Sequence, residues 1–174
     1  MSQKESIRPG RKLDRARRRL LTAAVAAGAG LGLFGRQASA QETDSIDDLH
    51  FPGDEPEHKL LFQLNKADPG YQEHVLFSVG AVLRKYGDNV KIVVVAFAEG
   101  IHVLAREPLR PVSEEIQSRV SSLAQYGVEF HACGNTLKSL NWDESDVVDF
   151  AQVVEVGAAD MMELQEQGYS YISW

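Results

Sequence analysis

The sequence contains a single cysteine, Cys133, so no disulfide can form within one chain. It also lacks a glycine-rich phosphate loop, a Gly-x-Ser-x-Gly nucleophile elbow and a paired-carboxylate constellation. These absences argue against nucleotide hydrolysis, serine hydrolysis and glycoside hydrolysis. They leave Cys133 as the residue on which a chemical function would depend.

The apolar run from residue 20 to residue 34 is shorter than the ~20 residues that a membrane-spanning helix needs. It follows an arginine-rich stretch and ends before Ala38-Ser39-Ala40, a small-residue cleavage site. Arg17-Arg18-Arg19-Leu20-Leu21 resembles the twin-arginine consensus, although Ala16 replaces the usual Ser or Thr. We therefore expect residues 1–40 to be a removable signal that delivers the protein to the periplasm, with membrane contact only during export.

Basic residues are scarce beyond this segment. Residues 1–40 hold nine Lys and Arg against two Asp and Glu, so residues 41–174 hold nine against 23, a net charge of −14. No basic stripe remains to bind a phosphate backbone, which excludes nucleic acid as a partner. Residues 41–57 are acidic and aperiodic and are typical of an arm or linker, whereas residues 58–174 have the length of one domain.

Apolar runs and amphipathic segments alternate along residues 58–174. Strands are expected over residues 60–64, 90–98, 128–132, 151–156 and 169–173, and helices over 71–86, 114–125, from about 134, and over 158–167. Ile92-Val93-Val94-Val95 is continuously apolar, as in a strand covered on both faces. The pattern predicts an α/β fold of three layers, with a mostly parallel five-stranded sheet and helices on both faces.

In such a sheet, functional groups gather in the loops at the carboxyl ends of the strands. Three segments lie in these loops: Asn65 with Lys66, Glu99 to His102, which includes Gly100, and Cys133 to Asn135. We expect these residues to meet at one edge of the sheet.

Cys133 has three interpretations: a buried bystander, an intermolecular disulfide linker, or a reactive thiol. A helix that begins directly after it would direct free N–H groups and a positive dipole end at the sulfur, which favours the thiolate. Its polar neighbours and its loop position favour the reactive thiol. His131 would share a strand face with Cys133, while Asn135 and Thr136 would donate hydrogen bonds. His102, His131 and Cys133 together could also supply three metal ligands, a minor hypothesis.

Several segments resemble the DsrE/DsrF-like sulfur-relay family, whose fold the YchN-type proteins share. They are Val94 to Gly100, Val128 to Leu137 and Gly157 to Trp174, and the likeness extends over residues 58–174. The resemblance implies a homo-oligomer, often a trimer or hexamer, and a cysteine that carries sulfur as a persulfide to a partner thiol. That role falls on Cys133, with Gly100 lining the adjacent loop.

The sequence thus predicts an exported protein that takes up sulfane sulfur on Cys133 and passes it to a thiol-bearing protein or a small sulfur compound, without an organic cofactor. The predicted site comprises Cys133 with His131, Gly134, Asn135, Thr136, Gly100, His102 and Asn65. Whether transfer is catalytic stays open. The alternative is a non-catalytic binding or assembly module that holds a small ligand or metal in the same crevice.

Overall fold

The computed structural model describes residues 53–174. The expected signal segment, residues 1–40, and all but the last five residues of the expected arm lie outside the described residues. Within the described part of the chain, no helix combines the length and the apolar character needed to cross a membrane.

Five strands form one sheet in the order β4-β3-β2-β1-β5, and every pair of neighbours is parallel. The strands are β1 (His58–Leu64), β2 (Val90–Ala96), β3 (Glu129–Cys133), β4 (Ala151–Val154) and β5 (Ser170–Ile172). The helices are α1 (Pro69–Tyr86), α2 (Glu114–Gln125), α3 (Gly134–Ser139) and α4 (Gly157–Glu166), with 3₁₀ helices η2 (Ala98–Leu104) and η3 (Glu144–Asp146). The predicted parallel α/β sheet is confirmed.

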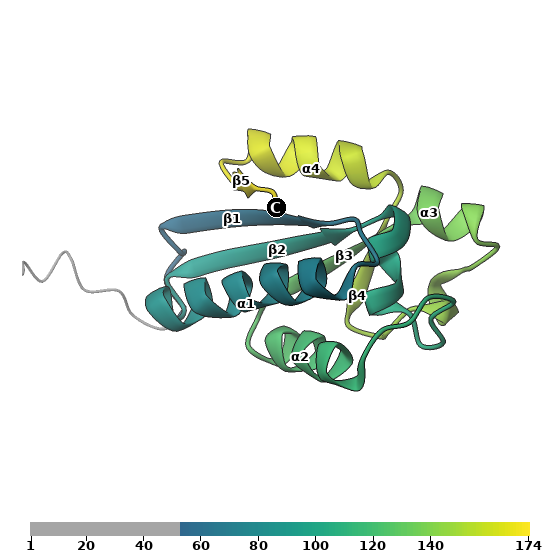
Figure 1. Ribbon diagram of the computed structural model, residues 1–174. Helices are drawn as coiled ribbons and strands as arrows, with labels where there is room; N and C mark the ends of the chain where they lie inside the picture. Colours follow the sequence, from purple (N-terminus) through teal and green to yellow (C-terminus); the bar gives the residue numbers. More distant parts are fainter. Residues whose placement is uncertain (1–52) are drawn as a thin grey trace, which may run out of the picture. The chain divides into compact units, whose positions relative to one another are not determined.

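Helices α1 and α2 cover one face of the sheet, and α4 covers the other (Figure 1). Local signals fix the two larger helices. Asp68 accepts from the Tyr71 N–H at 2.7 Å, Pro69 opens α1, and Ser113 caps α2 through the Ile116 N–H at 3.2 Å. Each of these two helices therefore begins where a side chain satisfies one of its free N–H groups.

Side chains alternate between the two faces along each strand. Phe62, Ile92, Val94 and Phe130 belong to the large apolar core under α1 and α2. The residues between them point to α4, where a smaller cluster gathers: Leu61, Val93, Val95, Leu164 and Tyr169. On β3 this alternation sends Phe130 and Ala132 into the large core and leaves Glu129, His131 and Cys133 on the α4 face.

Residues 99–102, expected to be an open loop, belong instead to η2, whose residues from Gly100 to Leu104 are buried. A Cβ on Gly100 would lie 2.0 Å from the Leu64 carbonyl oxygen, so the segment folds back against β1 only because residue 100 has no side chain. Strand β2 is also shorter than the expected 90–98, since it ends at Ala96.

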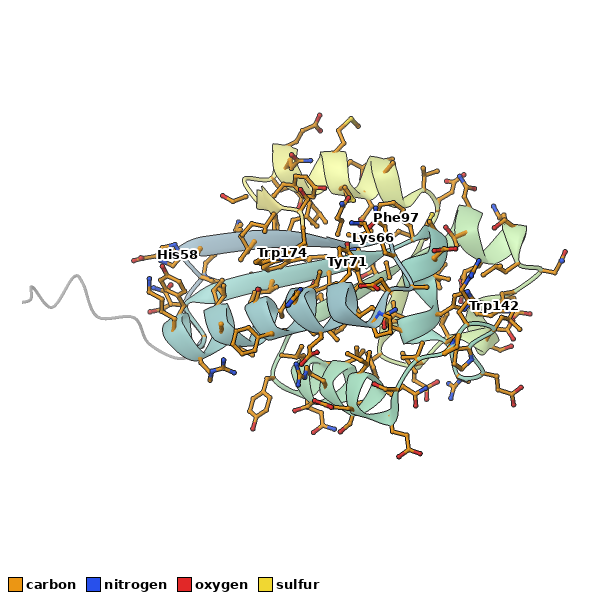
Figure 2. All side chains as sticks on the ribbon, viewed as in Figure 1. His58, Lys66, Tyr71, Phe97, Trp142 and Trp174 are labelled. Carbon is orange, nitrogen blue, oxygen red and sulfur yellow. The ribbon has the colours of Figure 1, made fainter. Side chains whose placement is uncertain are left out.

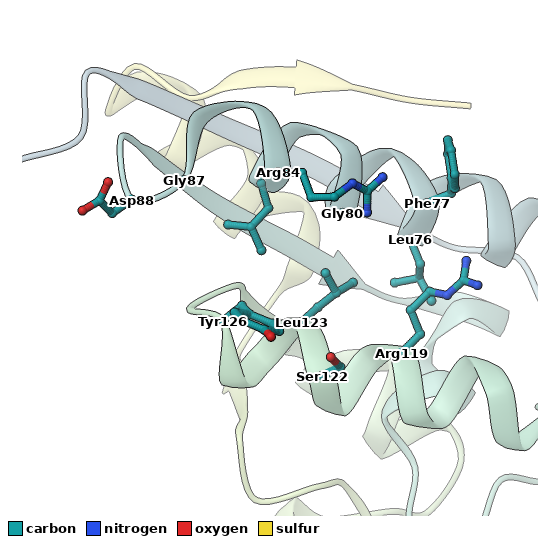
Figure 3. A pocket seen from close by; sticks show the side chains of 11 residues that line it. Leu76, Phe77, Gly80, Arg84, Gly87, Asp88, Arg119, Ser122, Leu123 and Tyr126 are labelled. Carbon is teal, nitrogen blue, oxygen red and sulfur yellow. The ribbon is translucent and has the colours of Figure 1, made fainter. Parts of the chain in front are cut away.

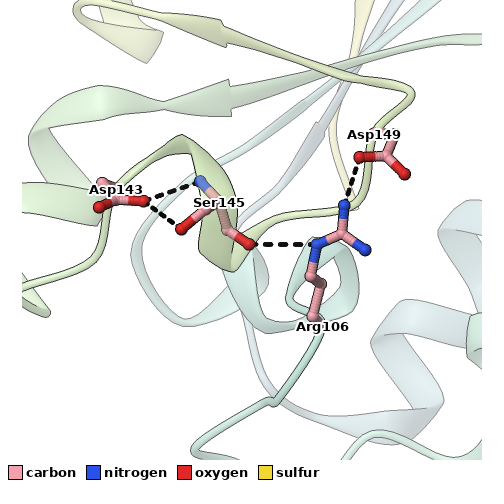
Figure 4. Close-up of polar contacts among 4 residues, drawn as sticks. All are labelled: Arg106, Asp143, Ser145 and Asp149. Carbon is pink, nitrogen blue, oxygen red and sulfur yellow. Dashed lines mark hydrogen bonds and ion pairs between the residues drawn. The ribbon is translucent and has the colours of Figure 1, made fainter.

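Arg106 ties the segment after η2 to the loop around η3 at the carboxyl edge of the sheet. Its Nε donates to the Ser145 carbonyl at 3.1 Å, and its guanidinium pairs with Asp149 (Figure 4). The Asp143 carboxylate accepts from the Ser145 N–H and hydroxyl, which caps η3. A single antiparallel bridge between Ala105 and Val147 joins the same two segments.

Candidate functional site

Cys133 is the last residue of β3 and the residue directly before α3, as the sequence predicts. It is 6% exposed, so the sulfur is nearly enclosed. Its surroundings are not purely apolar, because backbone and side-chain donors from two other elements reach it. The structure therefore places the thiol at the carboxyl end of a central strand, under the beginning of α4.

The Gly157 N–H donates to Cys133 Sγ at 3.3 Å. Gly157 is the first residue of α4, which follows β4, the neighbour of β3 in the sheet. A Cβ on Gly157 would lie 3.0 Å from Cys133 Cβ and 3.4 Å from its sulfur. Only glycine therefore lets the first turn of α4 approach the sulfur this closely without displacement.

Burial raises the pKa of the Cys133 thiol, because it disfavours the charged form. Hydrogen bonds from the Gly157 N–H, from the Thr136 side chain and from the backbone of Thr136 and Asn135 act against burial. Together they prevail, and the pKa of the thiol lies below its ordinary value. These hydrogen bonds thus favour the thiolate, which is the form that attacks electrophilic sulfur.

Thr136 connects the cysteine loop to the end of β2. Its hydroxyl oxygen accepts from the Ala98 N–H at 3.1 Å, which leaves the hydroxyl hydrogen free to donate towards the sulfur. Ala98 has a φ of 48°, in the left-handed region that glycine favours. The Asn135 N–H donates to the Glu155 carbonyl at 3.2 Å, so its interaction with the sulfur is secondary, and the Gly157 N–H makes the well-formed hydrogen bond to Sγ.

His131 lies two residues before Cys133 on the same strand face, as expected, and it is buried. Its Nδ1 donates to Asp160 Oδ2 at 2.7 Å, and its Nε2 lies 3.9 Å from Glu129 Oε2. Nε2 has no hydrogen-bond partner. Both ring nitrogens are therefore directed towards carboxylates, and the hydrogen bond that orients the ring comes from α4.

Gly134 is packed as tightly as Gly157, since a Cβ there would lie 3.0 Å from the Val154 carbonyl oxygen. Gly100 lies against the end of β1, directly beside the Asn65 N–H. The Asn65 side chain is bound by α1, because its Oδ1 accepts from the hydroxyl of Tyr71 at 2.9 Å. Lys66 lies 4.5 Å above the same ring, and Figure 2 labels both residues.

His102 is 3% exposed and packs edge-on against Trp142 at a ring distance of 5.2 Å. Burial and the positive charge of Arg110 lower the pKa of His102, while Glu99 opposes them. No group of three or more His, Cys, Asp and Glu side chains suited to a metal is present in residues 53–174. The structure therefore does not assemble His102, His131 and Cys133 into a three-ligand metal site.

A hollow with a volume of about 880 Å³ lies elsewhere, between α1 and α2 (Figure 3). Phe77 and Tyr126 line it and are 60% and 73% exposed. None of the predicted site residues contributes to it. This groove and the cysteine site are separate features on different layers of the fold.

Gly157 and Asp160 were not predicted to belong to the site. They lie 24 and 29 residues beyond Cys133 and His131, and no local pattern relates them. One signal was available: Gly157 opens the helix that follows a strand, and in a parallel sheet the carboxyl ends of neighbouring strands lie together. The pairing of β3 with β4 could not be derived from residue pattern alone.

The sequence pattern of the DsrE/DsrF-like family matches residues 58–174. No curated protein matches the chain. The solved structure of MTH1491 from Methanobacterium thermoautotrophicum, a protein of unknown function, is similar to it with 29% identity and a TM-score of 0.61. The match covers 68% of this chain and 100% of that one.

Two further structures share the fold at lower identity. The ychN protein from E. coli has 13% identity and a TM-score of 0.54, over 67% of this chain and 99% of its own. BT1422 from Bacteroides thetaiotaomicron, a conserved protein of unknown function, has 13% identity and a TM-score of 0.52, over 67% and 94%. These likenesses confirm the architecture that the sequence predicts.

Proposed function

The chain belongs to the DsrE/DsrF-like family, and from that premise we propose that it carries sulfane sulfur as a persulfide on Cys133. Family membership supports a sulfur-relay role in general. The observation that carries the finer proposal is the hydrogen bond from the Gly157 N–H to the sulfur, with a thiol pKa below its ordinary value. A buried bystander cysteine needs neither.

In the loading step, the Cys133 thiolate attacks the outer sulfur of a polysulfide or hydropersulfide. A new S–S bond forms on Cys133, the S–S bond of the donor breaks, and the rest of the donor leaves as a sulfide or thiolate anion. In the unloading step, an acceptor thiolate attacks the outer sulfur of the persulfide, and Cys133 leaves as a thiolate. Sulfur moves between thiols, and no external oxidant or reductant is consumed.

The 6% exposure of Cys133 favours a small donor over a folded protein at the loading step. The outer sulfur of the persulfide lies one atom beyond Sγ, and it is the atom that the acceptor thiolate attacks. The N–H of Gly157 and the hydroxyl of Thr136 would stabilise the sulfur anion formed in each step.

Intact-mass measurement after incubation with polysulfide tests this function. The protein should gain the mass of one sulfur atom and lose it again with dithiothreitol, while the Cys133→Ser variant should gain none. Equal uptake by the two proteins would refute the assignment. In the alternative of a non-catalytic binding or assembly module, neither protein would take up sulfur.

We also propose export by the twin-arginine route, supported by the arginine pair, the apolar run and the Ala38-Ser39-Ala40 site. Replacement of both Arg17 and Arg18 by Lys should retain the protein in the cytoplasm in a fractionation experiment. Secretion of that variant at the normal level would contradict this route. The homo-oligomer that the resemblance implies stays a prediction, which light scattering on the purified protein measures.

A further inference from the structure

Asp160 occupies the first turn of α4, three residues after Gly157, and its side chain is 15% exposed. Residues three apart on a helix lie on one face, and residues two apart on a strand do as well. Two positions of α4 therefore meet two positions of β3. Gly157 contacts Cys133 at 3.3 Å, and Asp160 contacts His131 at 2.7 Å.

The two contacts differ in strength. The N–H to sulfur contact, at 3.3 Å, has an ordinary length for sulfur, which is a weak acceptor, whereas the His131 to Asp160 contact is a short hydrogen bond to a carboxylate between largely buried groups. The residue before α4, Val156, provides no side-chain cap. Asp160 thus gives the start of this helix a side-chain hydrogen bond to the strand carrying the cysteine.

We propose that Asp160 is a positioning residue for Cys133 and acts through His131. By its hydrogen bond to His131, Asp160 holds the first turn of α4 where the Gly157 N–H reaches the sulfur. The geometry of His131 fits this role, because Nδ1 alone makes the hydrogen bond to Asp160, while Nε2 makes none and lies 3.9 Å from Glu129. This positioning role rests on the proposed function, in which the Cys133 thiolate is the reacting group. It can nevertheless be tested by measuring the reactivity of the thiol, without any sulfur transfer.

Electrostatics and positioning give opposite expectations for this site. If Asp160 acted on the sulfur only through its negative charge, its removal would favour the thiolate and speed alkylation. If Asp160 positions α4, its loss lets the Gly157 N–H retreat and slows alkylation. Asparagine separates the two, because its Oδ1 still accepts from His131 Nδ1 while the charge is gone.

The experiment measures the rate of Cys133 alkylation by iodoacetamide against pH in the folded full chain. Asp160→Ala should slow the reaction at neutral pH roughly tenfold, the change that one unit of thiol pKa produces. Asp160→Asn should react at least as fast as the unchanged protein. Glu163→Ala, which removes an exposed carboxylate one turn further along α4, should leave the profile unchanged.

An Asp160→Ala rate equal to or above that of the unchanged protein would overturn the proposal, as would equal slowing by Ala and Asn. If Asp160→Ala fails to fold by circular dichroism, Asp160→Ser replaces it, since its hydroxyl is too short to reach His131. Failure of sulfur uptake in the unchanged protein would refute the persulfide function. It would leave the alkylation profiles, and hence the positioning role, interpretable on their own.

Discussion

The two faces of the sheet are built from the same strands but have different contents. Under α1 and α2 lies a continuous apolar core, to which alternate residues of three strands contribute. Under α4 the apolar cluster is small, and next to it lie Cys133, the His131–Asp160 pair and an ion pair between Lys91 and Glu129 at 3.1 Å. Burial of apolar side chains stabilises the fold mainly on the first face, and the second face holds more polar and ionisable side chains.

The distinction is sharpest on β3, where neighbouring residues face opposite ways. Phe130 is 1% exposed and packs in the large core, whereas His131 contacts α4. Substitutions along this one strand should therefore separate stability from thiol chemistry.

The largest loss of stability is expected from Phe130→Ala on the apolar face. It removes a large buried side chain and leaves a cavity, which costs about 3–5 kcal/mol of unfolding free energy. Chemical denaturation measures it. The matched control is Glu129→Ala, a half-exposed position one residue away, which should change the unfolding free energy by less than about 1 kcal/mol. Equal costs at the two positions would remove the contrast between the faces.

Gly100→Ala should cost about 3 kcal/mol, because its Cβ would overlap the carbonyl oxygen of Leu64 and η2 would have to move. Gly80→Ala, in the middle of α1, meets only ordinary contacts and should stabilise the protein by about 0.5–1 kcal/mol through helix propensity. Thermal unfolding of the two variants compares them. A stable Gly100→Ala protein would show that η2 can shift without cost.

Gly157→Ala should have a smaller effect on stability, about 1–2 kcal/mol, and a clear effect on the thiol. The added methyl group contacts Cys133 Cβ and displaces the N–H from the sulfur, so the pKa of the thiol should rise and alkylation at neutral pH should slow. Iodoacetamide kinetics measure this. An unchanged rate would mean that other donors suffice to stabilise the thiolate.

The smallest effect concerns acid stability. Because the pKa of His102 is lowered in the folded state, the unfolded chain binds a proton more readily. The resulting stability is present above the unfolded pKa of about 6.5 and is lost as the pH falls below it. His102→Phe, packed against Trp142, should show a shallower fall in Tm between about pH 7 and about pH 5.

The control for this acid effect is His58→Phe, at an exposed position beside Tyr86 at the amino end of the sheet (Figure 2). It should keep the normal dependence of Tm on pH. The hypothesis about His102 is rejected if the two variants lose stability in parallel.

Local signals predicted most of the fold. The bounds of α2 agree residue by residue with the expected 114–125, since Ser113 caps the helix and Gly127, with a φ of 89°, lies just beyond its end. The apolar run from Ile92 to Val95 identified the central strand that both faces bury. By contrast, no local sequence signal predicted η2. This 3₁₀ helix depends on the close approach of Gly100 to the end of β1, which is a contact between segments distant in the sequence.

The sequence by itself determined the order of strands and helices and the position of Cys133 at a strand end, because periodicity, caps and turn residues act over a few neighbours. Only the tertiary structure decided that β4 lies beside β3 and that α4 begins over the sulfur. Hydrogen bonds depend on distances in space, and the residues that hold Cys133 and His131 are 24 and 29 positions away along the chain.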